Sequence, residues 1–268
     1  MKNLIGKDKK VHMVGIKGVG MTALAEILLA QGMRVSGSDV VEIFMTDAVL
    51  ARLSIPVYDF DALHTRGMDM VIYSQAYTAD HVEIHAAQAA GIPLFSYPEA
   101  LAALSAMYKS VAVAGSHGKT TTTAMLAHIL HYAKKEPHAI VGSIVVNWGS
   151  GALTSSIRGD AGLFVFEADE YKEAFLRYYP YGAIMTNIDY DHPDYFKDSA
   201  TYTHAFAQFI TRIPQEGFLI INGDDRVLCD IAEKYATCKI KKVTEKNSIS
   251  FSLHLPGCLL YTSPSPRD

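Results

Sequence analysis

The stretch that most constrains the fold is residues 110–132, which read SVAVAGSHGKTTTTAMLAHILHY. An apolar run at 111–114 leads into a glycine loop, Gly115-Ser-His-Gly-Lys-Thr-Thr-Thr, and apolar residues at helical spacing follow it. Strand, glycine loop and helix in this order are the context of a phosphate-binding P-loop. The loop amides and the helix N-terminus direct positive partial charge at an anion. The stretch therefore predicts a nucleoside triphosphate site.

Two polar side chains of this loop, those of Lys119 and Thr120, can be given a role. Lys119 would reach the β- and γ-phosphates, and the Thr120 hydroxyl would bind magnesium. The usual G-x-x-x-x-G-K-[ST] spacing requires glycine at position 113, where this chain has Val113. The alternative is a surface loop with a chance GKT. The expected ATP-binding residues are Gly115, Ser116, His117, Gly118, Lys119, Thr120 and Thr121.

Composition limits the kind of partner. The 268 residues leave room for two domains, and 49% hydrophobic with 19% charged residues is ordinary for an α/β enzyme. A net charge of -4 offers no basic face, so we expect no nucleic-acid partner. Three cysteines without a C-x-x-C pair fit a reducing compartment. No signal peptide or membrane-spanning run is visible, and we expect a cytoplasmic protein without membrane insertion.

A second glycine turn lies near the N-terminus. A strand-like run at 11–16 enters Gly18-Val-Gly20, helical spacing follows at 22–29, and a strand at 33–39 ends in Asp39. An acidic residue about 20 positions after a glycine loop is the dinucleotide-type arrangement. Lys17 stands where G-x-G-x-x-G would need glycine, which suits phosphate but weakens the case for NAD. A plain strand–helix turn is the alternative.

Strand-like and helix-like segments alternate along the rest of the chain, which predicts a parallel sheet with helices on both faces. We expect helices at 46–53, 80–90, 98–104, 121–133 and 200–210, strands at 55–58, 70–75, 92–97, 111–114, 139–141, 163–166, 181–188 and 218–222, and a polar glycine-rich loop at 147–160.

Three parts follow from this alternation. Residues 1–108 are expected to form a Rossmann-like α/β domain with a parallel sheet. Residues 109–255 are expected to form a P-loop α/β ATP-binding domain that is incomplete. Residues 256–268, PGCLLYTSPSPRD, begin no new α/β unit and read as an anomalous, foreign tail.

Two apolar strands end in acids, in the sequences FVFEADE and AIMTNIDYDH. A carboxylate at the end of a strand beside a P-loop commonly anchors the magnesium of the nucleotide. Glu167 is the first acid after its strand and the best candidate, while strand alternation points Asp169 and Glu170 elsewhere. His192 is either a hydrogen-bonded loop residue or a metal ligand, and Asp191 could orient it from behind.

These motifs occur in an order that resembles the Mur ligases. Gly115-Ser-His-Gly-Lys-Thr-Thr-Thr is similar to the ATP loop of that family. His12-Met-Val-Gly-Ile-Lys-Gly-Val-Gly-Met with Ser36-Gly-Ser-Asp resembles its N-terminal UDP-binding domain. Phe166-Glu-Ala-Asp-Glu-Tyr and Thr186-Asn-Ile-Asp-Tyr-Asp-His-Pro-Asp look like its central domain.

The resemblance implies an activity and its cofactors. Family members of the most similar type use ATP and Mg²⁺ to join L-alanine to the lactyl carboxylate of UDP-N-acetylmuramate through an acyl phosphate, in peptidoglycan precursor synthesis. The resemblance makes Lys119, Glu167 and His192 the catalytic residues, with Thr120, Glu167 and His192 as metal ligands. The implied UDP-sugar contacts are Gly18, Val19, Gly20, Met21, Ser38, Asp39, Ser74 and Ala76.

Two departures leave alternatives open. Many relatives have glycine at the position of Lys17, and the adenine-site segment and third domain of the family, which binds the amino acid, are not visible in this sequence. We therefore expect the chain as written to be inactive in ligation. The alternatives are a sister ligase that adds a recycled murein tripeptide to the same UDP-sugar, and a non-catalytic nucleotide-binding fragment.

Overall fold

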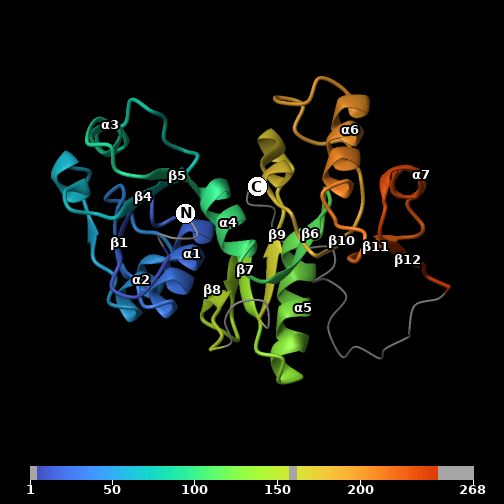
Figure 1. The fold of residues 1–268 in the computed structure, drawn as a ribbon, viewed down its shortest axis with the longest axis horizontal. Helices are drawn as coiled ribbons and strands as arrows, with labels where there is room; N and C mark the ends of the chain where they lie inside the picture. Colours follow the sequence, from blue (N-terminus) through green and yellow to red (C-terminus); the bar gives the residue numbers. More distant parts are fainter. Residues whose placement is uncertain (1–4, 157–161, 247–268) are drawn as a thin grey trace.

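The computed structural model describes residues 5–156 and 162–246, which build two β-sheets lying side by side along the long axis of the molecule (Figure 1). Strands of the first sheet lie between residues 10 and 96, and strands of the second between 109 and 243. The strand pairs are parallel except for one hairpin. The α/β fold predicted from the alternating segments is confirmed.

The first sheet has the strand order β3-β2-β1-β4-β5. Its strands are β1 (Lys10–Val14), β2 (Arg34–Ser38), β3 (Val57–Tyr58), β4 (Met70–Tyr73) and β5 (Leu94–Ser96). Its helices are α1 (Val19–Ala30), α2 (Asp47–Arg52), η2 (Ala62–Thr65), α3 (Val82–Ala89) and α4 (Tyr97–Ser105). The order reverses between β1 and β4, so a ligand crevice is expected beyond their carboxyl ends.

The second sheet has the order β12-β11-β10-β6-β9-β7-β8. Its strands are β6 (Lys109–Ala114), β7 (His138–Val145), β8 (Ser150–Leu153), β9 (Leu163–Glu167), β10 (Gly182–Met185), β11 (Phe218–Asn222) and β12 (Lys239–Val243). Its helices are α5 (Lys119–Tyr132), η4 (Tyr171–Arg177), α6 (Ser199–Ile210) and α7 (Arg226–Tyr235). The central β6 leads into the glycine loop at 115–118, between the ends of β9 and β10.

Several elements differ from the sequence prediction, including the short helices η2 and η4, which it did not contain. The expected loop at 147–160 contains β8, which pairs antiparallel with β7. Its Ser-Gly-Ala-Leu sequence lacks the β-branched and aromatic residues that mark strands, and pairing holds it in place instead. We also missed α7 and β12, which extend the second sheet beyond β11. The predicted tail at 256–268 lies outside the described residues.

Local signals fix where several helices begin. At α4, Ser96 and Glu99 form a reciprocal capping box, with Pro98 in the first turn. The Asp198 carboxylate caps α6, and Asp225 caps α7 by accepting from the Leu228 amide. In the described ranges, the longest helix is α5 with 14 residues, and no helix is both long and apolar enough to cross a membrane.

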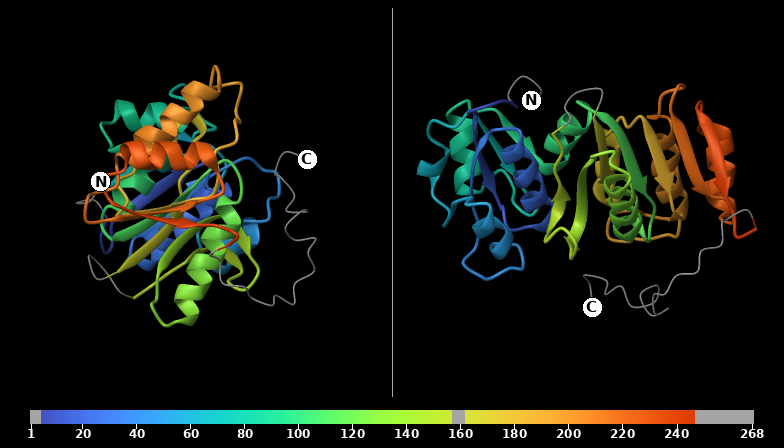
Figure 2. Two further views of the ribbon diagram at one scale, coloured as in Figure 1. Left: turned by 90° about the vertical axis from the view of Figure 1, so that its right-hand side faces the viewer. Right: turned by 90° about the horizontal axis from the view of Figure 1, so that it is seen from below.

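The two sheets meet where α1 packs on the β7–β8 hairpin, seen clearly in the view from below (Figure 2). The junction is buried. Gln31 at the end of α1 donates from Nε2 to the Tyr108 hydroxyl at 2.8 Å, and His138 of β7 lies 3.5 Å from the same nitrogen. All three side chains are less than a tenth exposed. This buried contact joins the end of α1 in the first sheet's layer to β7 of the second sheet.

Candidate nucleotide site

The loop between β6 and α5 has a shape that requires glycine. Gly115 has φ of +133° and Gly118 has φ of +78°, a region that other residues rarely adopt. A Cβ on Gly115 would lie 2.1 Å from the Thr186 hydroxyl oxygen at the end of β10. Asn187 pins the same loop, because its side-chain oxygen accepts from the His117 amide at 2.9 Å. The loop is therefore fixed before any ligand binds.

The Lys119 ammonium folds back over this loop. Its Nζ donates to the carbonyl oxygens of Gly115 (2.7 Å) and Ser116 (3.2 Å), and to the Glu170 carboxylate at 2.7 Å. The side chain remains only 16% exposed. A cation held at the N-terminus of α5 is placed to meet an anion that enters the loop.

Thr120 and Glu167 lie together beside the loop. The Thr120 hydroxyl donates to Glu167 Oε2 at 3.0 Å, and the Gly142 amide of β7 donates to the other carboxylate oxygen. Burial raises the pKa of Glu167, against the lowering effects of these hydrogen bonds and of Lys119. Hydroxyl and carboxylate oxygens are the donors that Mg²⁺ prefers, so this pair fits that ion.

Glu170 is more central than the sequence suggested. Its carboxylate is fully buried and contacts Lys119, the His192 ring at 3.3 Å and the Tyr202 hydroxyl at 3.4 Å. Strand alternation was the wrong guide because β9 ends at Glu167, and the chain then turns into η4. Burial raises the pKa of Glu170, and Lys119 opposes that rise.

His192 enters the same site from the loop after β10. Its Nε2 lies 3.3 Å from Glu170 and 3.8 Å from Asp191, whose other oxygen accepts from the His192 amide at 2.7 Å. The expected orienting role of Asp191 agrees with these contacts. Side-chain atoms of Asp169, Glu170 and His192 also lie close enough together to share a cation.

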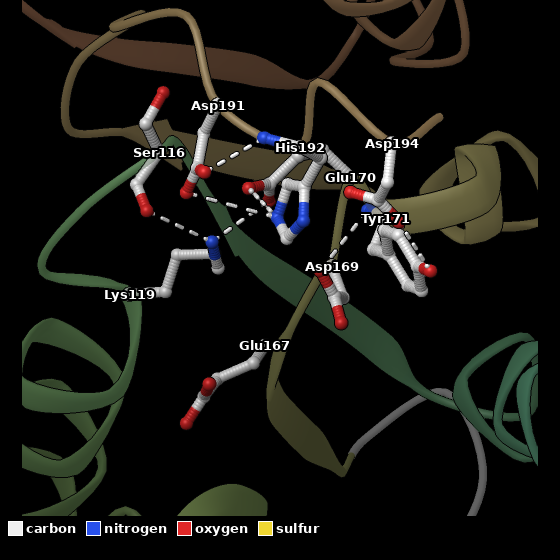
Figure 3. A pocket seen from close by; sticks show the side chains of 9 residues that line it. All are labelled: Ser116, Lys119, Glu167, Asp169, Glu170, Tyr171, Asp191, His192 and Asp194. Carbon is white, nitrogen blue, oxygen red and sulfur yellow. Dashed lines mark hydrogen bonds and ion pairs between the residues drawn. The ribbon is translucent and has the colours of Figure 1, made fainter. Parts of the chain in front are cut away.

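These groups line one cavity of about 580 Å³ (Figure 3). Lys119, Glu170, Asp191 and His192 converge on one side of it, while the Glu167 carboxylate points away from them. The lining residues are Ser116, Lys119, Glu167, Asp169, Glu170, Tyr171, Asp191, His192 and Asp194. Five carboxylates beside one lysine and a glycine loop suit a metal-bound polyphosphate better than a bare anion.

The first glycine loop is built differently. Asp39, at the end of β2, accepts from the Lys17 amide at 2.7 Å and from the Val40 amide at 2.8 Å. The position of Lys17 in the sequence suggested that its ammonium faces the loop. In the structure the ammonium points away from it. It donates to the carbonyls of Val40 (2.9 Å) and Glu42 (2.8 Å). Any phosphate here would meet backbone amides of α1.

The other predicted UDP-sugar residues divide into two groups. Gly18, Val19, Gly20 and Met21 form the N-terminus of α1, and Ser74 and Ala76 follow β4 across the crevice. The Ala76 amide donates to the Ser74 hydroxyl at 3.3 Å. Ser38 is different, because its hydroxyl is buried beneath the sheet and donates to Glu83. The Ser38 hydroxyl is therefore already paired with a buried carboxylate.

Comparison with known families now defines the class of protein. The model described as "Mur ligase family, catalytic domain" matches residues 10–109, and the "Mur ligase middle domain" matches residues 113–253. The second match alone covers more than half of the chain. The chain belongs to the Mur ligase family.

Two individual relatives show which kind of Mur ligase this chain is similar to. The UDP-N-acetylmuramate–L-alanine ligase of Desulfitobacterium hafniense (strain Y51) is 44% identical over 216 residues, covering 80% of this chain and 47% of the relative. The ligase of the same name from Borreliella burgdorferi is 41% identical over 255 residues, covering 93% and 52%. The chain spans about half the length of the curated relatives it matches.

Solved structures include two kinds of ligase. The UDP-N-acetylmuramate:L-alanyl-gamma-D-glutamyl-meso-diaminopimelate ligase from Neisseria meningitides has a TM-score of 0.78 and 31% identity, covering 88% of this chain and 78% of that one. The UDP-N-acetylmuramate-alanine ligase from Thermotoga maritima has a TM-score of 0.70 and 28% identity, covering 83% and 51%.

Proposed function

We propose that this chain carries the UDP-sugar and ATP sites of a ligase that joins L-alanine to the lactyl carboxylate of UDP-N-acetylmuramate, in peptidoglycan precursor synthesis. The observation that carries the proposal is the Lys119 ammonium over a glycine loop, beside the Thr120–Glu167 pair and within an acidic cavity. The names of the relatives with 41–44% identity support the substrate pair.

In this proposal five residues in or beside the cavity have a task. Lys119 leaves Glu170 to bind the β- and γ-phosphates of ATP, and the amides at the start of α5 bind them from below. Thr120 and Glu167 would hold one Mg²⁺, and His192 with Glu170 would hold a second. When bound, Mg²⁺ neutralises the charge that builds up on the transferred phosphoryl group.

The two chemical steps need alignment more than they need an acid or base. The lactyl carboxylate attacks the γ-phosphorus of ATP, forming an acyl phosphate and releasing ADP. The amine of L-alanine then attacks the acyl carbon, and phosphate leaves as the amide bond forms. Holding the reactants in line contributes on the order of 7–11 kcal/mol in favourable intramolecular cases. The junction at α1 and β7–β8 supports this alignment, because it packs the two sheets that carry the glycine loops against each other.

The UDP-sugar belongs to the first loop. We propose that residues 1–108 form the unit that binds it, with Gly18, Val19, Gly20 and Met21 at the diphosphate and Asp39 at the ribose. Ser74 and Ala76 would close on the same nucleotide from the end of β4. The Asp39 carboxylate is already oriented by two backbone amides, which supports a fixed hydrogen-bond acceptor there.

A second candidate is the ligase that adds a murein tripeptide to the same UDP-sugar. The likeness to the Neisseria ligase, with a TM-score of 0.78, favours it. Both candidates share ATP, Mg²⁺ and the UDP-sugar, and differ in the amine. A non-catalytic nucleotide-binding role predicts binding without turnover.

The test distinguishes these three candidate functions by the amine that the protein consumes. A full-length version is supplied with ATP, Mg²⁺ and UDP-N-acetylmuramate. Phosphate release is then followed with L-alanine or with the tripeptide. We expect release with L-alanine and none from the Lys119→Met variant. Release with the tripeptide alone would favour the second candidate, and binding without release in either case would favour the non-catalytic role.

A further inference from the structure

A second cluster of metal-ligating side chains lies between the first sheet and the helices η2 and α3, away from the nucleotide cavity. It consists of His12 in the middle of β1, His64 on η2 and Glu83 in the first turn of α3. One atom from each lies within 4.8 Å of the others. His12 and Glu83 are fully buried, and the His64 side chain is 27% exposed.

The distances within this cluster are long for hydrogen bonds between charged groups. His12 Nε2 lies 3.4 Å and His64 Nδ1 lies 3.3 Å from the same oxygen, Glu83 Oε1. Charge-assisted N–H···O bonds are typically about 2.7–2.9 Å. Two ligands of a tetrahedral zinc ion, each bound at about 2.0–2.1 Å, lie about 3.3 Å apart. The spacing therefore matches the edges of a tetrahedral metal site.

The surroundings orient each ligand. His12 Nδ1 lies 3.0 Å from the Ser36 hydroxyl, which leaves Nε2 facing Glu83. A metal-binding histidine commonly uses its second nitrogen in this way. The other oxygen of Glu83 accepts from Ser38, and the His64 ring stacks on Tyr58 with centroids 4.6 Å apart.

A buried carboxylate also needs a positive partner. Glu83 is fully buried, and its carboxylate accepts from the Ser38 hydroxyl and from the Asp61 amide at 3.2 Å, both of which are neutral donors. The ion-pair partners found for Glu83 in the described part of the chain are the two histidines. Either a histidine carries a proton or a cation supplies the charge.

We propose that His12, His64 and Glu83 form a binding site for a Zn²⁺-like transition-metal ion, independent of the magnesium site. Two imidazoles and one carboxylate select such ions over Mg²⁺, which favours oxygen ligands. The ion would tie η2 and α3 to β1, beside the Ser38 hydroxyl, which lies 3.3 Å from His12 Nε2. Partial exposure of His64 gives the ion a route in from solvent.

Cobalt is the probe, because its visible absorption reports tetrahedral nitrogen and oxygen coordination. The full 268-residue chain is treated with a chelator, dialysed, and titrated with CoCl₂ in excess MgCl₂, which occupies the oxygen-rich cavity. We expect one equivalent of cobalt to bind and Zn²⁺ to displace it. His64→Ala should lower the affinity by at least about 100-fold, and Ser36→Ala by about 10–100-fold, as for groups that orient a metal ligand.

Two control variants keep the result interpretable. His85 is exposed on the same helix as Glu83, so His85→Ala should bind cobalt like the parent chain. His192→Ala should also retain it, which separates this site from the nucleotide cavity. Circular dichroism checks that His64→Ala is folded. Failure of the parent to bind cobalt would overturn the proposal and point to a protonated histidine beside Glu83. Unchanged affinity in His64→Ala, or loss of binding in His192→Ala, would also overturn it and would place the bound cobalt elsewhere, in the second case in the nucleotide cavity.

Discussion

The two glycine loops follow the same plan of strand, glycine turn and helix, yet their lysines behave in opposite ways. In the first loop Lys17 turns its ammonium away and binds the carbonyls of Val40 and Glu42. In the second loop Lys119 folds over its own loop and reaches Glu170. The first loop therefore offers an anion only backbone amides, while the second offers amides, a cation and nearby carboxylates.

The difference comes from the strands beside each loop. Next to β6, the neighbouring strands end in Glu167 and in Thr186-Asn187, which place polar groups around the loop. Next to β1, the strands end in Asp39 and Ser74. In the function proposed above, the first loop binds a diphosphate without metal and the second binds a metal-bound triphosphate. The glycine turn supplies an anion site, and its neighbours decide which anion.

The largest expected difference between the two loops comes from replacing one glycine in each of them with alanine. Gly115→Ala combines a disfavoured φ with a contact 2.1 Å from the Thr186 oxygen, and should cost about 3 kcal/mol or more together with ATP binding. Gly18→Ala meets nothing closer than 3.7 Å and should cost less than about 1 kcal/mol. Urea unfolding of both variants measures the difference. Equal losses would show that the loops are under similar constraint.

The next largest difference is expected when each of the two lysines is replaced by methionine. Lys119→Met should weaken Mg²⁺-dependent ATP binding by about 10–100-fold, since it removes a charge-assisted contact to phosphate. Lys17→Met should leave ATP affinity unchanged but destabilise the fold by about 1–3 kcal/mol, because the Val40 and Glu42 carbonyls lose their donor. Calorimetry with ATP and thermal unfolding distinguish the two. An ATP loss in Lys17→Met would contradict the assignment.

A smaller effect concerns the first loop alone. Asp39→Asn removes the charge while keeping the size, and should weaken UDP-N-acetylmuramate binding about tenfold with little change in ATP binding. The matched control is Asp47→Asn, whose carboxylate lies near the Lys17 ammonium and not at the loop amides. Binding of the UDP-sugar that is unaffected by Asp39→Asn would remove Asp39 from the site.

Sequence patterns predicted the fold well where each segment carried its own signal. The apolar strands β1, β6 and β9 and the glycine turns after β1 and β6 were recognisable because burial on both faces demands unbroken apolar runs. The strand β8 was missed because Gly151 and Ala152 carry no strand preference, and β12 because its lysines give an edge strand a polar sequence. Only pairing with a neighbour makes these segments strands.

The site was predictable to the same extent. Lys119, Thr120 and Glu167 stand at positions fixed by a loop or a strand end, and the structure brings them together as their spacing predicted. Glu170 lies beyond the end of β9, where the direction of a side chain depends on the turn into η4. The orientation of Lys17 depended on the loop at 40–42, which carries no recognisable motif. The direction of such side chains depends on tertiary contacts and not on the periodicity of the sequence.

The smallest expected effect is a pH dependence that should occur only at the second loop. Burial raises the pKa of Glu167 above 4.5, so Mg²⁺ must displace a proton as the pH falls through the raised pKa. ATP affinity with Mg²⁺ should therefore decrease toward acidic pH, by less than about tenfold per pH unit for one proton. UDP-sugar affinity should not follow this curve. Glu167→Gln should weaken ATP binding and flatten its profile.

The same raised pKa has an opposite consequence for the ligand-free fold. The folded chain holds the Glu167 proton more tightly than the unfolded chain does, so this group's contribution to stability falls as the pH rises from about 4.5 through the raised pKa. Denaturation midpoints of the parent and Glu167→Gln chains, compared between about pH 5 and pH 8, measure it. A parent chain that gains stability relative to the variant over this range would contradict the sign.

The central claim is that the two loops hold two different nucleotides at the same time. The most direct measurement is calorimetric titration of this chain with ATP and Mg²⁺, with and without saturating UDP-N-acetylmuramate. We predict one ATP per chain in both titrations, loss of the ATP signal in Lys119→Met, and retention of UDP-sugar binding by that variant. If UDP-N-acetylmuramate competes with ATP for a single site, the assignment of one loop to each nucleotide is wrong.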